Sequence, residues 1–474
     1  MFLDSLRIFP VSLQSLCSIF NVQGKITPYN PKWNSLEVFK DKEEFKKLIK
    51  YVGQDSAALQ KALKVAQLTY INKYGVDITN VVSLPMLAMK IFRLNFQKEP
   101  IPILTGFNEY FVRKAYFGGA VDIYKAYAKN CYYYDIVSLY PYAMCKPMPL
   151  ELLETLTGPA LQNFNLKDFF GFIELELECP QTVKRPVLPF KWQNRTIYPK
   201  GKFSGVYFSE EIKDMLNFGY KITKIKCAKR FSKGYVFNDY VKEMFELKRD
   251  SVGALRWIAK LLLNSLYGTF ARKQELLKTV TVPNDMVPAY LVSYPSSTVL
   301  DSGEDTSTIL YEDRPNDQAL DQLGATYQDD SSFKRNVKAN VAIAAAITSY
   351  ARIHMNRIKQ LSIVIYSDTD SAITTEPLPD NLIGKDIGMF KDELDGCVIQ
   401  EIYVLGIKQY GFWYLDKQGN RVERSVWAGY TRDSISFNEI REIFNGKKIT
   451  KVVDNRFFRS FPRESLLHKF VKST

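Results

Sequence analysis

The stretch Tyr134-Asp135-Ile136-Val137-Ser138-Leu139-Tyr140-Pro141 places an aspartate at the end of a run of β-forming residues. Aromatic and β-branched side chains are frequent in this region, which favours a buried strand from Cys131 to Leu139. A carboxylate at the end of such a strand lies beside a cleft while the strand itself stays in the core. Pro141 is expected to stop the strand, and Tyr140 to form one wall of a pocket there.

A second stretch, Tyr366-Ser367-Asp368-Thr369-Asp370-Ser371, follows an apolar run and predicts a β-hairpin with its tight turn at 367–370. Its two carboxylates repel each other unless a cation lies between them. With the two predicted strands side by side, Asp135 faces Asp368. Oxygen ligands without histidine suit Mg²⁺ or Mn²⁺ better than zinc. Two such ions about 3.5–4 Å apart would clamp the attacking and leaving oxygens of a phosphoryl transfer.

The third stretch, Lys260-Leu-Leu-Leu-Asn264-Ser-Leu-Tyr267-Gly268, is expected on a helix from Ala254 to Lys273 that forms a hairpin with a helix from Asn238 to Asp250. The polar residues at 256, 260, 264 and 267 share one helical face, because they recur every three or four positions. Such a face offers a cation for a triphosphate and a ring that can stack under a base pair. Lys248, at the end of the preceding helix, is expected near the same phosphates.

Each of these features has an ordinary explanation when it is taken alone. A strand-end aspartate is usually a cap or a surface ion-pair partner, and Asp-x-Asp is common turn chemistry or, less often, part of a calcium loop. A helix face with Lys, Asn and Tyr is usually a solvated face, and Tyr116-Phe117-Gly118-Gly119 would ordinarily be a flexible turn. The three chemical stretches together, in this order, favour a functional interpretation.

The charge of the chain favours a polyanionic partner. Sixty-four Lys and Arg against 51 Asp and Glu give +13, and residues 301–330 alone carry about −8, which leaves about +21 on the rest. The acidic segment 301–332 is expected to be an exposed, partly mobile insertion. Six scattered cysteines and two histidines make a zinc site or a disulfide framework a poor explanation. No apolar run reaches the roughly 18–20 residues of a membrane span, so no membrane partner is expected.

The pattern along the 474 residues predicts an α/β (α+β) protein of two to four subdomains with inserted helical parts. Helical periodicity runs from Lys42 to Lys73 and is expected in two pieces, one on either side of Gly53. Residues 171–178 alternate with period two, as a half-exposed strand does. An alanine-rich helix is expected from Asn336 to Ile358.

These residues resemble a known family. Asp135 to Pro141 is similar to motif A, Lys260 to Gly268 to motif B, and Tyr366 to Ser371 to motif C of the family B DNA polymerases. Tyr116-Phe117-Gly118-Gly119 resembles the Y-x-G-G element, and Lys408-Gln409-Tyr410 the K-x-Y element, of the protein-primed subgroup found in some bacteriophages, adenoviruses and linear mitochondrial plasmids. The resemblance spans roughly residues 45–415.

The resemblance implies a right-hand polymerase fold. Residues 101–146 and 336–414 would form the palm, 236–275 the fingers and 415–474 the thumb. Residues 147–235 and 276–335 would be two insertions, and 1–100 a remnant of a 3′–5′ exonuclease domain. The implied partners are a DNA template-primer, deoxynucleoside triphosphates and a terminal protein that primes synthesis.

The resemblance also implies roles for single residues. The implied catalytic residues are Asp135, Asp368 and Asp370, and two Mg²⁺ or Mn²⁺ ions would be held by Asp135, Val137 and Asp368. Tyr140 would be the steric gate against ribonucleotides. The other residues implied to bind the nucleotide are Lys248, Lys260, Asn264, Tyr267 and Gly268. Those implied to contact DNA are Tyr116, Gly118, Gly119, Thr369, Lys408 and Tyr410.

One departure concerns proofreading. Tyr51-Val-Gly-Gln-Asp55 resembles the third exonuclease motif, but the first two, which lie upstream in the family, do not precede it here. We therefore expect Tyr51 and Asp55 to be remnants and 3′–5′ exonuclease activity to be absent.

Two alternatives remain at this stage. One is a catalytically decayed, nucleic-acid-binding relic of such a polymerase, and the other is a reverse transcriptase, which usually carries adjacent aspartates where Thr369 separates them here. Composition and the absence of a targeting peptide favour a mitochondrial plasmid, with a phage-infected cytoplasm as the other location.

Overall fold

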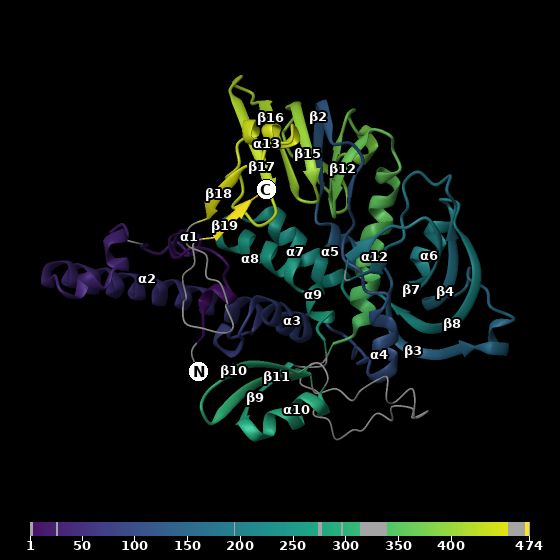
Figure 1. Cartoon of the computed structure of the whole chain (residues 1–474), viewed down its shortest axis with the longest axis horizontal. Coiled ribbons are helices and arrows are strands. Elements are labelled where there is room, and N and C mark those ends of the chain that lie inside the picture. Colours follow the sequence, from purple (N-terminus) through teal and green to yellow (C-terminus); the bar gives the residue numbers. More distant parts are fainter. Residues whose placement is uncertain are drawn as a thin grey trace. The chain divides into compact units, whose positions relative to one another are not determined.

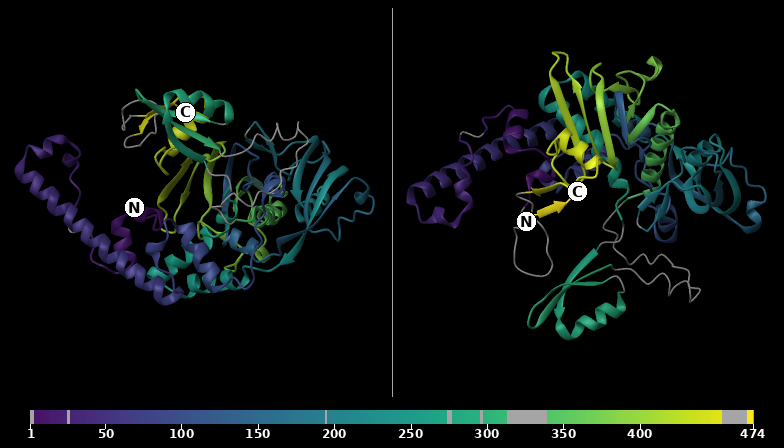
Figure 2. Two further views of the ribbon diagram at one scale, coloured as in Figure 1. Left: turned by 90° about the horizontal axis from the view of Figure 1, so that it is seen from below. Right: turned by 45° about the horizontal axis from the view of Figure 1, so that its top comes forward.

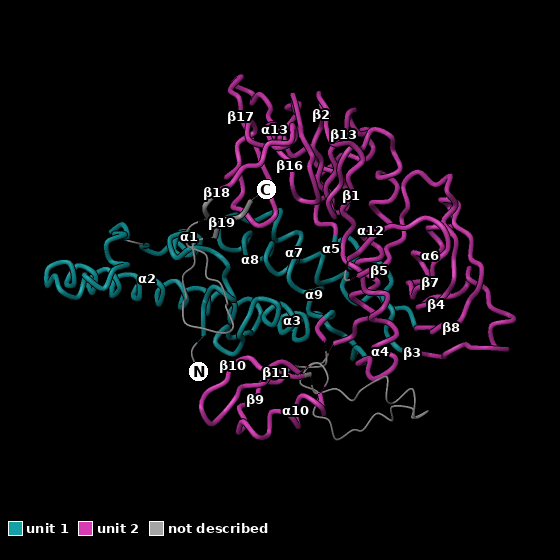
Figure 3. Tube along the Cα trace, viewed as in Figure 1, with its two compact units in different colours: residues 1–102, 140–151, 232–271 teal, residues 103–139, 152–231, 272–474 magenta. Residues whose placement is uncertain are grey.

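The computed structural model describes residues 3–24, 27–193, 195–273, 277–294, 297–312, 339–453 and 470–473. The chain divides into two compact units (Figure 3). Unit 1 contains residues 1–102, 140–151 and 232–271, and unit 2 contains residues 103–139, 152–231 and 272–474. Unit 1 therefore combines the N-terminal region with the two predicted hairpin helices.

Unit 1 is mainly helical. Its α-helices are α1 (Leu13–Ile19), α2 (Lys42–Tyr74), α3 (Leu84–Asn95), α7 (Asn238–Asp250), α8 (Gly253–Ser265), α9 (Tyr267–Phe270) and most of α5 (Leu139–Met144). Short 3₁₀ turns lie at η1 (Ser5–Arg7), η2 (Pro31–Asn34), η3 (Leu36–Phe39) and η4 (Ile78–Asn80). The predicted helix over 238–250 has the expected bounds.

Helix α2 is a single helix, so the prediction of two pieces is wrong (Figures 1 and 2). Its buried face repeats every four residues through Ala58, Ala62, Ala66, Tyr70 and Tyr74. Gly53 lies outside this stripe, exposed, where an added Cβ would meet nothing within 4 Å. An exposed glycine costs a helix only about 1 kcal/mol relative to alanine, which the packed stripe outweighs.

The predicted helix over 254–273 is also corrected, because α8 ends at Ser265 and only one further turn, α9, follows. The Ser265 hydroxyl donates to the Leu261 carbonyl at 2.7 Å. A hydrogen bond from a serine side chain to the carbonyl four residues earlier often bends a helix. Helices α7 and α8 pack against each other, and the Tyr240 hydroxyl donates to the Leu262 carbonyl at 2.8 Å. The helical hairpin is confirmed, although its second helix is shorter than predicted.

The main sheet of unit 2 is antiparallel, with strand order β1-β12-β13-β2-β15-β16-β17, and β14 pairs with β2 (Figure 1). Its strands are β1 (Val121–Ile123), β2 (Tyr127–Ile136), β12 (Val364–Asp368), β13 (Ser371–Thr374), β14 (Phe390–Asp392), β15 (Ile399–Gly406), β16 (Gln409–Leu415) and β17 (Arg421–Trp427). The predicted β-hairpin is confirmed as β12 and β13. The prediction that the strands of Asp135 and Asp368 are neighbours is wrong, because β13 lies between them.

Strand β2 ends at Ile136, three residues before the predicted end, and α5 begins at Leu139. Ser138 has a φ of 55°, a left-handed conformation that no strand continues through. Pro141 then lies in the first turn of α5, where a missing N–H removes no helical hydrogen bond. Thus Ser138, and not Pro141, separates the strand from the helix.

A second antiparallel sheet has the order β3-β8-β4-β7. Its strands are β3 (Met148–Thr157), β4 (Gly171–Cys179), β7 (Gly201–Phe208) and β8 (Lys221–Gly234), and it carries η5 (Gly158–Leu161), the small ladder of β5 (Phe190–Trp192) with β6 (Arg195–Ile197), and α6 (Ser209–Leu216). Burial alternates along β4, as predicted for 171–178.

The remaining elements of unit 2 are α4 (Gly106–Arg113), β9 (Leu277–Pro283), η6 (Asn284–Met286), α10 (Val287–Ser293), β10 (Thr298–Ser302), β11 (Thr306–Glu312), α12 (Val341–Lys359), η7 (Asp380–Leu382), α13 (Phe437–Phe444), β18 (Thr450–Val453) and β19 (Phe470–Ser473). Strands β10 and β11 cover the start of the acidic segment, and residues 313–338 lie outside the described residues. Helix α12 begins later than predicted, because the Asn340 side chain accepts from the Ala342 N–H and caps it.

Candidate active site

Three residues of unit 2 form a row across β12, β13 and β2. Asp368 pairs with Ser371, and Ser371 pairs with Asp135. Directly paired residues of antiparallel strands point to the same face, so both carboxylates leave the sheet on one side. Two strand spacings of about 4.8 Å separate their Cα atoms by about 10 Å. The Ser371 side chain between them is small, so the space between the two carboxylates can accommodate a ligand.

The turn between Asp368 and Ser371 is held from one side by residues 119–120. Thr369 has a φ of 58°, and its N–H donates to the Ala120 carbonyl at 2.8 Å. Gly119 lies so close to this turn that an added Cβ would stand 2.5 Å from Cγ2 of Thr369. Only glycine fits at that position. By contrast, a Cβ at the exposed Gly118 would meet nothing within 4 Å.

Lys408 lies beside the same turn. Its ammonium Nζ is 2.5 Å from Oδ2 of Asp368, and its backbone N–H donates to the Tyr366 hydroxyl at 3.2 Å. Lys408 also has a left-handed backbone, with a φ of 55°. Left-handed residues other than glycine are uncommon and gather at functional sites. Ser138 of the first stretch, Thr369 of the second and Lys408 of the K-x-Y element are three such residues.

Asp370 is half-buried in the turn that follows Asp368. Burial raises the pKa of its carboxyl, the charge of Asp368 raises it further, and the ammonium of Lys408 lowers it. Its backbone carbonyl accepts from the Ile136 N–H at 2.8 Å, which ties the turn to the strand of Asp135. The two predicted catalytic stretches are therefore joined by a main-chain hydrogen bond.

The donor set fits a metal that arrives with a phosphate substrate. Mg²⁺ prefers oxygen ligands and is usually bound through one or two carboxylates together with substrate phosphates and water. Asp135 and Asp368 supply two such carboxylates on one face. No group of three or more His, Cys, Asp or Glu side chains placed to hold a metal occurs among the described residues. The Val137 carbonyl, a predicted ligand, accepts from the Gly388 N–H at 2.8 Å and would have to offer its second lone pair.

The K-x-Y element contributes Lys408 to this surface, whereas Tyr410 lies in the core. Tyr410 exposes 6% of its surface, and its ring centroid is 5.0 Å from that of Tyr366. Its ring supports the strand that carries Lys408 and the ring of Tyr366. Tyr116 is half-buried, and burial raises the pKa of its hydroxyl.

Unit 1 brings the predicted nucleotide-binding residues onto its own surface. Lys260 and Asn264 are exposed on α8, whose opposite side buries Leu262 and Leu263. The rings of Tyr140 and Tyr267 are stacked, with centroids 4.2 Å apart and an interplanar angle of 16°.

Lys248 and Gly268 are the other two nucleotide-binding candidates of unit 1. Lys248 is half-buried, and its ammonium lies 5.7 Å from the centroid of the Phe245 ring. Gly268 is exposed, and an added Cβ there would meet nothing within 4 Å, so packing does not require glycine at this position.

The predicted exonuclease remnants lie on α2. Tyr51 exposes 8% of its surface and packs with its ring centroid 5.1 Å from Trp33 and 5.9 Å from Tyr29. Asp55 is half-buried one turn further along the same helix. The Tyr51 ring is thus part of an aromatic cluster.

The sequence interpretation missed a buried ion pair between Glu211 of α6 and Arg352 of α12. Both side chains are 1% exposed. The available signal was an arginine directly after the run of mostly apolar and small residues from Val341 to Ala351, where burial of a charge demands a partner.

Comparison with known proteins gives a consistent result. The family model described as "DNA polymerase type B, organellar and viral" matches residues 24–363. A "Probable DNA polymerase" of Neurospora intermedia is 30% identical over 416 residues, which are 84% of this chain and 40% of that protein. A "Probable DNA polymerase" of Podospora anserina is 28% identical over 95% of this chain and 41% of its own length. The chain thus spans about two-fifths of the length of these two relatives.

Among solved structures, Phi29 DNA polymerase in a ternary complex with primer-template DNA and incoming nucleotide substrates matches with a TM-score of 0.66. The identity is 18%, and the match covers 99% of this chain and 78% of that one. This likeness shows that the chain has the right-hand polymerase fold. In the described residues, no helix is both long and apolar enough to cross a membrane.

Proposed function

Since the chain belongs to the organellar and viral type B DNA polymerases, we propose that it extends a DNA primer with deoxynucleotides under the direction of a DNA template. The single observation that carries the proposal is the row formed by Asp368, Ser371 and Asp135, which places two carboxylates on one face of the main sheet. Nucleotidyl transfer needs such a pair, because negative charge accumulates on the attacking, transferring and leaving oxygens.

The residues have distinct roles in the proposed reaction. The primer 3′-oxygen attacks the α-phosphorus of the nucleotide as the bond to the pyrophosphate oxygen breaks. Asp135 and Asp368 would hold two Mg²⁺ or Mn²⁺ ions, which would supply charge stabilisation for the attacking and leaving oxygens. Asp370 changes the electrostatic potential at Asp368, since its carboxyl lies within the same turn.

The unit 1 residues are proposed to bind the nucleotide. Lys248 and Lys260 bind its phosphates, and Asn264 and Tyr267 shape the space for the new base pair. Tyr140 excludes ribonucleotides, because its ring, stacked on Tyr267, would meet a 2′-hydroxyl. Gly268 keeps this surface open.

Contacts with the template-primer are assigned to Tyr116, Gly118, Gly119, Thr369, Lys408 and Tyr410. Lys408 is the strongest of these candidates, since its exposed ammonium beside Asp368 can reach a primer phosphate near the reacting end. Tyr410 acts from the core by supporting the strand of Lys408. Gly119 and Thr369 act through the shape of the turn that they form.

The subdomain assignment remains part of the proposal. It makes residues 101–146 and 336–414 the palm, 236–275 the fingers, 415–474 the thumb, and 147–235 and 276–335 two insertions. We also propose that synthesis starts on a hydroxyl of a terminal protein. A mitochondrion that carries a linear plasmid is the proposed location, with a phage-infected cytoplasm as the alternative.

We propose that this chain by itself lacks 3′–5′ exonuclease activity. Tyr51 supports this, because its ring is packed against Trp33 and Tyr29 in an aromatic cluster. The purified chain is expected to leave the 3′ ends of single-stranded DNA intact in Mg²⁺. EDTA-sensitive shortening of those ends would contradict the assignment.

Primer extension on matched templates tests the proposed activity. The purified chain should extend a DNA primer on a DNA template and fail on an RNA template of the same sequence. Equal extension on RNA would favour a reverse transcriptase. No extension on either template by a folded, DNA-binding protein would favour a decayed relic.

A further inference from the structure

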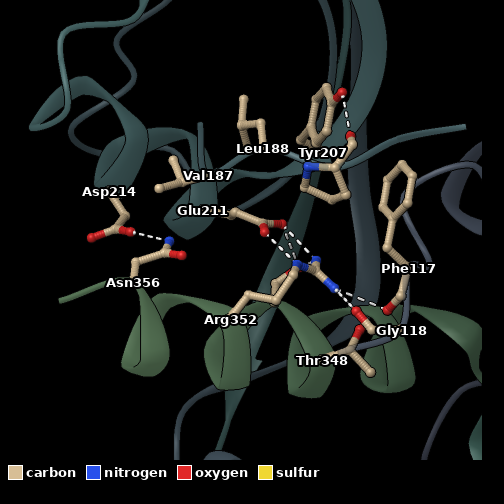
Figure 4. A network of polar contacts seen from close by, with 12 residues as sticks. Phe117, Gly118, Val187, Leu188, Tyr207, Glu211, Asp214, Thr348, Arg352 and Asn356 are labelled. Carbon is tan, nitrogen blue, oxygen red and sulfur yellow. Dashed lines mark hydrogen bonds and ion pairs between the residues drawn. The ribbon is translucent and has the colours of Figure 1, made fainter. Parts of the chain in front are cut away.

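Arg352 lies in the middle of a buried polar network in unit 2 (Figure 4). Its Nε donates to Oε1 of Glu211 at 2.6 Å, and its Nη2 donates to Oε2 at 2.7 Å and to the Ser349 hydroxyl at 2.9 Å. Its Nη1 donates to the carbonyls of Phe117 and Gly118, each at 2.9 Å. A guanidinium has five N–H groups, so five bonds use all of them.

The two carbonyls belong to the loop that supports the catalytic turn. One residue after Gly118, Gly119 packs against Thr369, and the next residue, Ala120, accepts the Thr369 N–H at 2.8 Å. Asp368 precedes Thr369 directly. A continuous path of contacts therefore runs from Glu211 through Arg352 and the 117–120 loop to the carboxylate of Asp368.

We propose that Arg352 and Glu211 are a positioning pair that sets the conformation of the Asp368 turn. This inference rests on the proposed function, since it assigns the turn to metal binding. Glu211 holds the guanidinium plane by a bidentate contact, and the plane then fixes the two loop carbonyls. The loop in turn limits where Thr369 and Asp368 can lie. Glu211 comes from α6, so residues outside the main sheet determine the geometry at its catalytic edge.

A purely structural ion pair would join the two helices α6 and α12 without any effect on the turn. The chain provides a matched control for that possibility. Asn356 of α12 donates through Nδ2 to Oδ2 of Asp214 of α6 at 2.9 Å. This bond joins the same two helices, and in Figure 4 it lies apart from Phe117 and Gly118.

The substitution Arg352→Lys separates the two roles of the arginine. Lysine keeps the positive charge beside Glu211, but its ammonium has only three N–H donors and no planar fork. It cannot hold the carboxylate by two bonds and both loop carbonyls at once. Asn356→Ala removes the control bond and leaves the loop contacts in place.

Two measurements are made on the wild type and on both variants of the full chain. Hydrogen exchange read by mass spectrometry follows peptides that cover 117–122 and 366–371, without Mg²⁺ and without DNA. Primer extension is then measured over a range of Mg²⁺ concentrations, to find the concentration that gives the half-maximal rate. Residues that orient metal ligands typically change metal affinity or activity by about 10–100-fold when they are substituted.

We expect Arg352→Lys to speed exchange in both peptides and to raise the half-maximal Mg²⁺ concentration about tenfold. Asn356→Ala should leave the 366–371 peptide and the Mg²⁺ requirement unchanged. If Arg352→Lys leaves the 366–371 exchange and the Mg²⁺ requirement at wild-type values, or if Asn356→Ala alters them equally, the inference is wrong.

The exchange data also separate this inference from the proposed function. A wild type that extends no primer overturns the proposed polymerase activity, while a faster exchange at 366–371 in Arg352→Lys alone still supports the coupling. If Arg352→Lys does not fold, Glu211→Gln serves instead, because the amide keeps the shape and one acceptor oxygen. It should loosen the same two peptides, and unchanged exchange in them would overturn the inference.

Discussion

Tyr140 and Tyr267 stack with their ring centroids 4.2 Å apart and their planes 16° from parallel. Offset stacking of aromatic rings contributes about 0.5–1.5 kcal/mol beyond area burial, so each ring restricts the rotation of the other. Tyr140 follows Asp135 by five residues, and Tyr267 is near the end of the α8–α9 segment. A sugar gate at Tyr140 would therefore owe its stiffness to Tyr267.

The first prediction is that Tyr140→Val admits ribonucleotides. Removal of the ring takes away the group that would meet a 2′-hydroxyl, while the smaller side chain still tolerates the deoxy sugar. The ratio of incorporation efficiencies for dNTP over rNTP should fall by about tenfold or more, since a lost clash of 1–2 kcal/mol corresponds to that factor. Single-nucleotide extension with each sugar measures it. Tyr140→Phe is the control and should retain the wild-type ratio. Unchanged selectivity in Tyr140→Val would contradict the gate assignment.

The second prediction concerns the close contact of Gly119 with Thr369. In Gly119→Ala the new methyl would stand 2.5 Å from the Thr369 Cγ2, so the turn must move. A shift of the turn that relieves this contact would also move the catalytic carboxylate of Asp368, and it is expected to lower kcat by about ten- to a hundredfold. In the double variant Gly119→Ala with Thr369→Gly the crowding is relieved, and part of the rate should return. A single variant with the wild-type kcat would show that the contact does not set the turn.

The third prediction is that Arg185 stabilises the entry to β12. Its guanidinium donates to the carbonyls of Leu361 at 2.7 Å and Val364 at 3.0 Å, and lies 3.8 Å from the centroid of the Tyr124 ring. Arg185→Ala should lower the free energy of unfolding by about 2–4 kcal/mol, because buried carbonyls lose charged donors. Chemical denaturation measures the change. The exposed neighbour Lys184 is the control. If Lys184→Ala lowers the free energy of unfolding as much as Arg185→Ala does, the assignment is wrong.

The fourth prediction follows from Asp214. Burial raises the pKa of its carboxyl, and Glu211 raises it further, whereas the hydrogen bond from Asn356 and the charge of Arg357 lower it. A carboxyl whose pKa is higher in the folded than in the unfolded state contributes stability below its unfolded pKa, near 3.9, and loses it as pH rises through the folded pKa.

Asp214→Asn removes this titration, so unfolding free energies measured from pH 4 to pH 7 should decline less with pH than those of the wild type. At pH 7 the variant should be at least as stable as the wild type. An unchanged slope would contradict the assignment of the raised pKa.

Local patterns predicted the elements that carry the chemistry. The β12–β13 hairpin follows from an apolar run, turn-forming Asp and Thr residues and a second β-forming run, and each of these signals lies within a few neighbouring residues. The exposed polar face of α8 follows from helical periodicity in the same way. These features depend on contacts between residues that are close in the sequence, so they can be predicted from local sequence patterns.

Features that depend on distant partners were not predicted. The insertion of β13 between the strands of Asp135 and Asp368 is a matter of sheet order, which side-chain alternation does not encode. Gly119 looked like part of a flexible turn, because its close neighbour Thr369 is 250 residues away in the chain. Arg352 gave only a weak signal, since its acceptors other than the Ser349 hydroxyl lie on two other segments.

The most direct test of the central claim is primer extension by the wild type and by Asp368→Asn on a primed DNA template with dNTPs and Mg²⁺. DNA binding by the same two proteins is measured alongside. The substitution removes one carboxylate charge and leaves the basic surface intact. We predict that the wild type extends the primer and that the extension rate of the variant is about a thousandfold lower, because several kcal/mol of charge stabilisation are lost. The two proteins should bind DNA with similar affinity. Extension by Asp368→Asn at nearly the wild-type rate would contradict the assignment of this carboxylate to catalysis.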